Sequence, residues 1–90
     1  MKPNIILVLL DGSRWDRTNI SSNFLDLQKR GTFVNNVTTA APYTFASVNT
    51  IFTGKYGKEN GVNAYYKMFK LKDSVAFLPE ILKKNGYFTS

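Results

Sequence analysis

The chain of 90 residues contains neither cysteine nor histidine. Without cysteine it cannot form disulfides, thiolate metal sites or a cysteine nucleophile. Without histidine it cannot assemble, from its own residues, a histidine-based catalytic triad or a histidine-rich zinc site. Enzyme classes that need either residue within this chain are therefore excluded, and any chemistry must use other side chains.

Acidic residues are scarce too, with six against twelve lysines and arginines, which gives a net charge of +6. Hydrophobic residues make up 43% and aromatic residues 14% of the chain, which indicates a folded protein. The positive charge favours anionic partners such as phosphate esters, sulfate esters, nucleic acid or an acidic membrane surface. The basic residues are scattered, so most are expected on a solvated surface, and no specific nucleic-acid partner is predicted.

Long hydrophobic runs are missing, because the apolar run from Ile5 to Leu10 is too short to span a bilayer. It also lacks a small-residue cleavage site, so no signal peptide is expected and a cytoplasmic location is the default. The run is apolar without alternation, which predicts a strand buried on both faces in a parallel sheet; a short buried helix is the alternative. Asp11 follows directly, either as a ligand-binding carboxylate at the sheet edge or as an ordinary turn residue.

A second stretch, from Ala41 to Gly54, predicts a loop that leads into a short helix. Pro42 stiffens the approach, helical spacing of apolar residues starts at Ala46, and Gly54 ends the helix. Thr44 then lies at or just before the first turn, where free backbone N–H groups attract an anion. Its hydroxyl can hold a phosphate or sulfate group or attack one, and the alternative is a simple N-cap.

The remaining pattern predicts alternating helices and strands within one domain, or part of one, over residues 1–90. Helices are expected from Ser21 or Ser22 to about Arg30 and from Leu78 to Asn85, strands at 32–38 and from 87, and a glycine-punctuated loop at 54–61. The aromatic segment 65–69 has no assignment. This order is typical of an α/β fold, and its last strand is unfinished.

With these residues in view, the chain resembles the N-terminal part of the alkaline phosphatase and sulfatase superfamily. The resemblance lies in three blocks, Pro3–Asp16, Ala41–Gly54 and Leu78–Tyr87, in the order and at the spacing of that family. It implies the N-terminal part of a mainly parallel sheet flanked by helices, and an incomplete one. The substrates it implies are phosphate or sulfate esters.

The resemblance also implies roles for two residues. Asp11 matches the family's metal-binding aspartate, and Thr44 matches the position of its nucleophile, which also binds the metal. The cofactor would be a divalent ion (Zn, Mn, Mg or Ca) that activates the hydroxyl. In relatives the other ligands come from the distant C-terminal half, so this chain alone is expected to be inactive and to need that part or another chain.

Departures from the family pattern restrict the kinds of ester that the chain is expected to act on. Threonine at position 44 cannot become formylglycine, and Ala46 and Val48 stand where sulfatases have proline and arginine. Asn60 occupies a place where relatives often have histidine, and Gly12 one where sulfatases often have a second aspartate. The resemblance therefore implies phosphate rather than sulfate esters as substrates.

Polar residues near these two positions have open roles. Arg14 is a candidate for binding the substrate anion, with Asp16 orienting it. The favoured alternative is a local ion pair or turn hydrogen bonds at the surface. For Ser47 and Asn49 we expect hydrogen bonds along the helix surface. The leading hypothesis is the N-terminal segment of a metal-dependent hydrolase or transferase; the alternative is a non-catalytic anion-binding or protein-interaction module.

Overall fold

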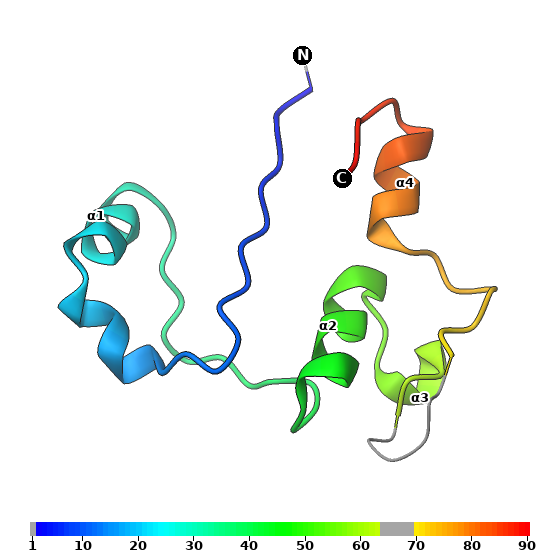
Figure 1. Cartoon of the computed structure of the whole chain (residues 1–90), viewed down its shortest axis with the longest axis horizontal. Helices are drawn as coiled ribbons and strands as arrows, with labels where there is room; N and C mark the ends of the chain where they lie inside the picture. The colour runs from blue at the N-terminus through cyan, green and yellow to red at the C-terminus, as the bar shows by residue number, and fades with distance from the viewer. Residues whose placement is uncertain (1, 64–69) are drawn as a thin grey trace. The chain divides into compact units, whose positions relative to one another are not determined.

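The computed structural model describes residues 2–63 and 70–90 and divides the chain into two compact units, residues 1–37 and 38–90. The regular elements are the 3-10 helix η1 (Trp15–Ile20) and the α-helices α1 (Ser22–Arg30), α2 (Thr44–Thr53), α3 (Gly57–Asn60) and α4 (Leu78–Lys84) (Figure 1). The unassigned aromatic segment 65–69 lies outside the described residues. That residues 1–90 form one domain, or part of one, stays a prediction.

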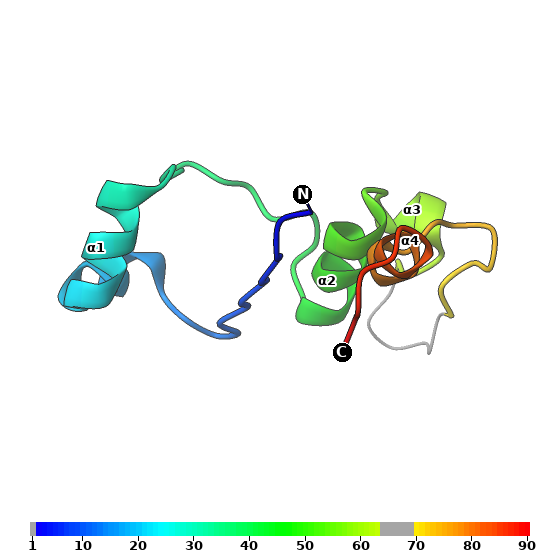
Figure 2. The same ribbon diagram turned by 90° about the horizontal axis from the view of Figure 1, so that it is seen from above.

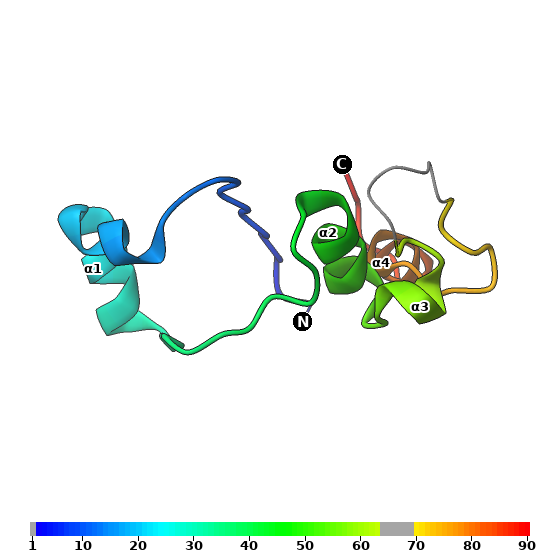
Figure 3. The same ribbon diagram turned by 90° about the horizontal axis from the view of Figure 1, so that it is seen from below.

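The first unit contains η1 and α1, which pack against each other (Figure 3). The bounds of α1 confirm the helix predicted from Ser21 or Ser22 to about Arg30. Ser21 occupies the N-cap position, although its side chain makes no capping hydrogen bond there. An ion pair one turn apart, from the Arg30 guanidinium to the Asp26 carboxylate at 2.7 Å, supports the exposed face of the helix.

The predicted parallel sheet is wrong, because residues 2–63 and 70–90 contain no β-strand. The three predicted strands, at 5–10, 32–38 and from 87, are irregular chain. A strand exists only when its N–H and C=O groups pair with a neighbour, and these segments do not pair with one another. The apolar side chains from Ile5 to Leu10 are 49–86% exposed, so the expected burial on both faces is also wrong.

The second unit is built on α2, which contacts both α3 and α4 (Figure 2). The Phe52 ring of α2 lies against the Phe77 ring, which precedes α4, with centroids 5.3 Å apart and planes tilted by 57°. Such tilted aromatic pairs combine apolar burial with a favourable edge-to-face component. In the first turn of α2, Ala46 is 2% exposed. The helix is therefore held at both ends of its inner face.

The boundaries of these helices follow local signals. Gly54 ends α2 in the left-handed conformation (φ +64°), as its position predicts, and its N–H donates to the Thr50 carbonyl at 2.9 Å. α4 confirms the predicted helix, with Pro79 in its first turn and Asn85 at its C-cap. α3 lies in the segment predicted as a loop, where the Glu59 carboxylate accepts from the Tyr56 N–H at 3.3 Å and stabilises one helical turn.

Asn60 is fully buried and closes the second unit through hydrogen bonds. Its side-chain Nδ2 donates to the Lys55 carbonyl at 2.9 Å and to Thr53 Oγ1 at 3.4 Å. Its Oδ1 accepts from the Val62 N–H at 2.8 Å, and its backbone carbonyl accepts from the Lys72 N–H at 2.9 Å. Through its side chain and its backbone carbonyl, this one residue joins the end of α2, the turn after α3 and the segment that leads to α4.

Replacing Asn60 by alanine is expected to lower the free energy of unfolding by about 1–3 kcal/mol, because the Val62 N–H and the Lys55 carbonyl would be left without this partner. Urea unfolding of the full chain, followed by circular dichroism, measures the loss. Asn63→Ala is the matched control, since Asn63 is exposed. Equal stabilities of the two variants would contradict the assigned role.

Candidate active site

Thr44 is the first residue of α2, and it is exposed. The N-cap position belongs to Tyr43, whose backbone is extended (φ −146°, ψ 153°), so Thr44 is not the simple N-cap of the alternative interpretation. The first turn of α2 contains no acidic residue. Its N–H groups and the positive end of the helix dipole therefore favour an anion next to the Thr44 side chain.

The loop before Thr44 is tied to the helix through the Ala41 carbonyl. That oxygen accepts from Thr39 Oγ1 at 2.9 Å and from Ser47 Oγ at 2.9 Å, and the two hydroxyl oxygens lie 3.0 Å apart. The expectation of a helix-surface hydrogen bond is correct for Asn49, which donates to the Phe45 carbonyl at 2.8 Å, and wrong for Ser47. Sequence reasoning missed Thr39 altogether, because no local pattern signals that its hydroxyl lies 3.0 Å from the hydroxyl of Ser47, eight positions later.

Asp11 lies in the first unit, in an exposed turn after the apolar run. The turn is closed by the Leu10 carbonyl, which accepts from the Ser13 N–H at 3.4 Å and from Ser13 Oγ at 2.9 Å. Gly12 adopts a φ of +70°, a conformation that glycine reaches without strain. Because Asp11 and Thr44 belong to different units, their convergence on one cation stays a prediction.

The residues described here do not complete a metal site. Within residues 2–63 and 70–90, no group of three or more His, Cys, Asp or Glu side chains lies close enough to hold a metal ion. A divalent cation takes about four ligands if it is Zn and about six or more if it is Mg or Ca, and Asp11 and Thr44 would supply two.

Arg14 and Asp16 form an ion pair with each other. Arg14 Nε donates to Asp16 Oδ1 at 3.0 Å, and Nη2 lies 2.6 Å from Oδ2, so both oxygens of the carboxylate are engaged. This is the local pair of the alternative interpretation. A role of Arg14 in binding substrate stays a prediction, and it would require the guanidinium to share or exchange this partner.

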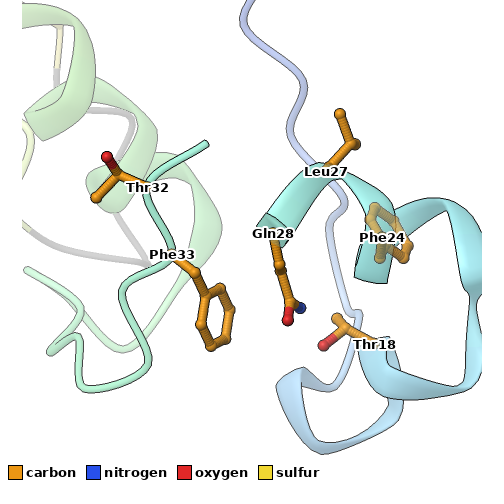
Figure 4. A pocket seen from close by; sticks show the side chains of 6 residues that line it. All are labelled: Thr18, Phe24, Leu27, Gln28, Thr32 and Phe33. Carbon is orange, nitrogen blue, oxygen red and sulfur yellow. The ribbon is translucent and has the colours of Figure 1, made fainter. Parts of the chain in front are cut away.

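Each unit has a hollow on its described surface. In the first unit, Gln28 and Thr18 lie opposite the Phe33 ring around a cavity of about 240 Å³ that Phe24, Leu27 and Thr32 also line (Figure 4). In the second unit, a cavity of about 380 Å³ is lined by Thr38, Thr39, Ala40, Thr50, Gly54 and Tyr56. Neither of these two hollows is lined by Thr44 or Asp11.

Comparison with known proteins places the chain in a class of hydrolases. The family model described as Sulfatase matches residues 3–90, so the chain belongs to the sulfatase family. This confirms the resemblance to the alkaline phosphatase and sulfatase superfamily. Neither the search of curated proteins nor the search of solved structures found a match.

The family match has consequences at a coarse level. It supports a sulfatase-like hydrolase and implies ester substrates. Members of the family generally use a divalent metal ion. Within the described ranges, no helix is both long enough and apolar enough to cross a membrane.

Breaking the Arg14–Asp16 pair is expected to change stability little. Asp16→Asn should lower the free energy of unfolding by less than about 1 kcal/mol, because exposed ion pairs are screened by water. Asp26→Asn, which weakens the exposed pair with Arg30, is the matched control. Urea unfolding of the full chain measures both. A much larger loss for Asp16→Asn than for the control would show that the pair is structural.

Proposed function

We propose that this chain carries the nucleophile of a metal-dependent hydrolase or transferase that acts on phosphate esters, and that Thr44 is that nucleophile. The observation that carries the proposal is the place of Thr44: an exposed hydroxyl residue at the first position of α2, with no acidic residue in that turn. A helix start of this kind favours the charge that develops on phosphoryl oxygens.

The reaction proceeds in two displacements. Thr44 Oγ1 attacks phosphorus, the Oγ1–P bond forms, and the P–O bond to the leaving group breaks. The threonine proton passes to solvent, and the leaving oxygen takes up a proton from water. A water molecule, or an acceptor alcohol in a transferase, then attacks phosphorus, breaks the Oγ1–P bond and releases phosphate or its new ester. The Thr44 hydroxyl regains a proton.

The preference for phosphate over sulfate follows from the residues around Thr44. Threonine cannot be converted to formylglycine, which the resemblance assigns to ordinary sulfatases. Ala46, in the place of the sulfatase proline, is buried, and Val48, in the place of the sulfatase arginine, is half-buried and carries no charge. A direct attack by a threonine hydroxyl needs none of that maturation machinery.

The charge of the second unit supports a second candidate, a non-catalytic module that binds anions. Residues 38–90 contain seven lysines against three acidic residues: Lys55, Lys58, Lys67, Lys70, Lys72, Lys83 and Lys84 against Glu59, Asp73 and Glu80. Such a module would bind a polyanion without a metal and would show no turnover. Its affinity for the polyanion would fall as salt is added. The assays below separate the two candidates.

Thr44→Ala is expected to lower turnover by roughly 10³-fold or more, because the attacking oxygen is lost. Thr44→Ser keeps the hydroxyl and should retain activity. The assays use p-nitrophenyl phosphate, bis(p-nitrophenyl) phosphate and p-nitrophenyl sulfate with added Zn, Mn, Mg or Ca, on this chain and on any longer form in which it occurs. If turnover survives in Thr44→Ala, Thr44 is not the nucleophile. Absence of turnover from every form would overturn the proposal.

Metal removal tests the role of Asp11. Chelation by EDTA is expected to abolish turnover, and adding back one of the four metals should restore it. Asp11→Asn should weaken metal affinity by at least roughly 10–100-fold, the loss that even an outer partner of a ligand causes. Asp26→Asn, on α1, is the matched carboxylate control. Metal content by mass spectrometry and calorimetric titration measure binding independently of activity. Unchanged affinity in Asp11→Asn would contradict its assignment.

A further inference from the structure

We infer that Ser47, reinforced by Thr39, is a positioning residue that holds the Thr44 hydroxyl in its reactive orientation. The inference rests on the proposed function, since it concerns how the nucleophile is presented. Neither residue needs to touch the substrate. Both act through the Ala41 carbonyl, which lies at the start of the three-residue approach to α2.

The hydrogen bonds of this cluster can be counted. Three oxygen atoms, Ala41 O, Thr39 Oγ1 and Ser47 Oγ, lie 2.9–3.0 Å from one another, and the two hydroxyls supply two hydrogens. Either both hydroxyls donate to the carbonyl, which has two lone pairs, or one donates to the other and that one donates to the carbonyl. In every arrangement the Ala41 carbonyl accepts at least one hydrogen bond.

The two hydroxyls do not contribute equally. Thr39 and Ala41 both belong to the loop, so their bond shapes the loop alone. Ser47 lies one turn inside α2, so its bond to Ala41 ties the loop to the helix across Thr44. Loss of the Ser47 hydroxyl would therefore detach the loop before Thr44 from the helix. Loss of the Thr39 hydroxyl would leave the bond between Ser47 and the Ala41 carbonyl in place.

The segment between these anchors has little remaining freedom. Pro42 fixes one backbone torsion, and the Tyr43 carbonyl accepts from the Ser47 N–H at 3.2 Å. Ala46, buried in the same turn, holds that end of the helix against the unit. The segment from Ala41 to Ser47 is thus closed by one backbone and one side-chain hydrogen bond, with Thr44 inside it. A nucleophile held in this way loses little orientational entropy on attack.

The test compares hydroxyl-deleted and hydroxyl-retaining variants of the form that turns over p-nitrophenyl phosphate. Ser47→Ala is expected to lower kcat by about 10- to 100-fold with KM nearly unchanged, because misplacement of the attacking atom affects the transition state and not ground-state binding. Ser47→Thr, which keeps the hydroxyl, should restore kcat. Thr39→Val should have a smaller effect, and the double variant should lose less than the product of the two single losses.

Thr50→Val is the matched control, since the Thr50 hydroxyl donates its hydrogen bond to the Ala46 carbonyl within α2. Melting temperatures and circular dichroism correct for any loss of folded protein, and the rate of phosphorylation of Thr44, measured by mass spectrometry after acid quenching, reports the attack itself. A fall in kcat that only follows the folded fraction would show a merely structural role and overturn the inference. So would wild-type kcat in Ser47→Ala.

The same labelling separates the two hypotheses. If the wild-type protein forms no phosphorylated Thr44, the proposed function fails, and this inference fails with it. If the wild type forms the adduct while Ser47→Ala forms it equally fast, the nucleophile stands and the positioning role alone is overturned.

Discussion

The second unit depends on the need of a buried amide to make all its hydrogen bonds. Asn60 is excluded from water, and an unpaired polar group in that place would destabilise a unit of this size severely. Its side chain therefore draws together backbone groups from both sides of α3. The Phe52–Phe77 contact adds apolar burial on the neighbouring face. Together these contacts fix the C-terminal end of α2. The hydrogen bonds of Thr39 and Ser47 to the Ala41 carbonyl fix the N-terminal end.

The helices could be predicted from the sequence, because their signals are local. Apolar spacing, Pro79 in a first turn and Gly54 after a last turn depend only on residues within one or two turns. The start of α2 differed by two residues, since Thr44 and Phe45 extend the helix before its apolar pattern begins. The single turn of α3 was not predicted, because the glycines of this segment indicate a loop. The hydrogen bond from the Tyr56 N–H to the Glu59 carboxylate, which stabilises the turn, has no signal in that pattern.

The strands could not be predicted correctly, and the reason is equally physical. The composition of 5–10 and 32–38 fits a strand, but a strand is defined by a partner that composition does not reveal. In the described ranges these segments remain extended or irregular, with side chains such as Ile6 and Val37 largely in water. The sequence pattern predicts which residues favour a β-sheet, but a sheet forms only where two such segments pair through backbone hydrogen bonds.

The candidate site was predicted in part. Pro42 and Gly54 bracket the helix and place Thr44 at its start, and the turn at Asp11 and Gly12 follows from ordinary turn chemistry. The Ser47–Ala41 bond could not be predicted, because it joins a helix side chain to a loop carbonyl whose position depends on the folded path of the chain.

The exposed apolar run has a consequence for handling the protein. Six consecutive aliphatic side chains, from Ile5 to Leu10, face solvent without a proline or a charge among them. Short segments of this composition readily stack into intermolecular cross-β assemblies. Lys2, Pro3 and Asp11 flank the run, and charged residues and prolines in such positions generally oppose this stacking. We therefore expect low salt, which preserves the repulsion between chains of charge +6, to limit such stacking.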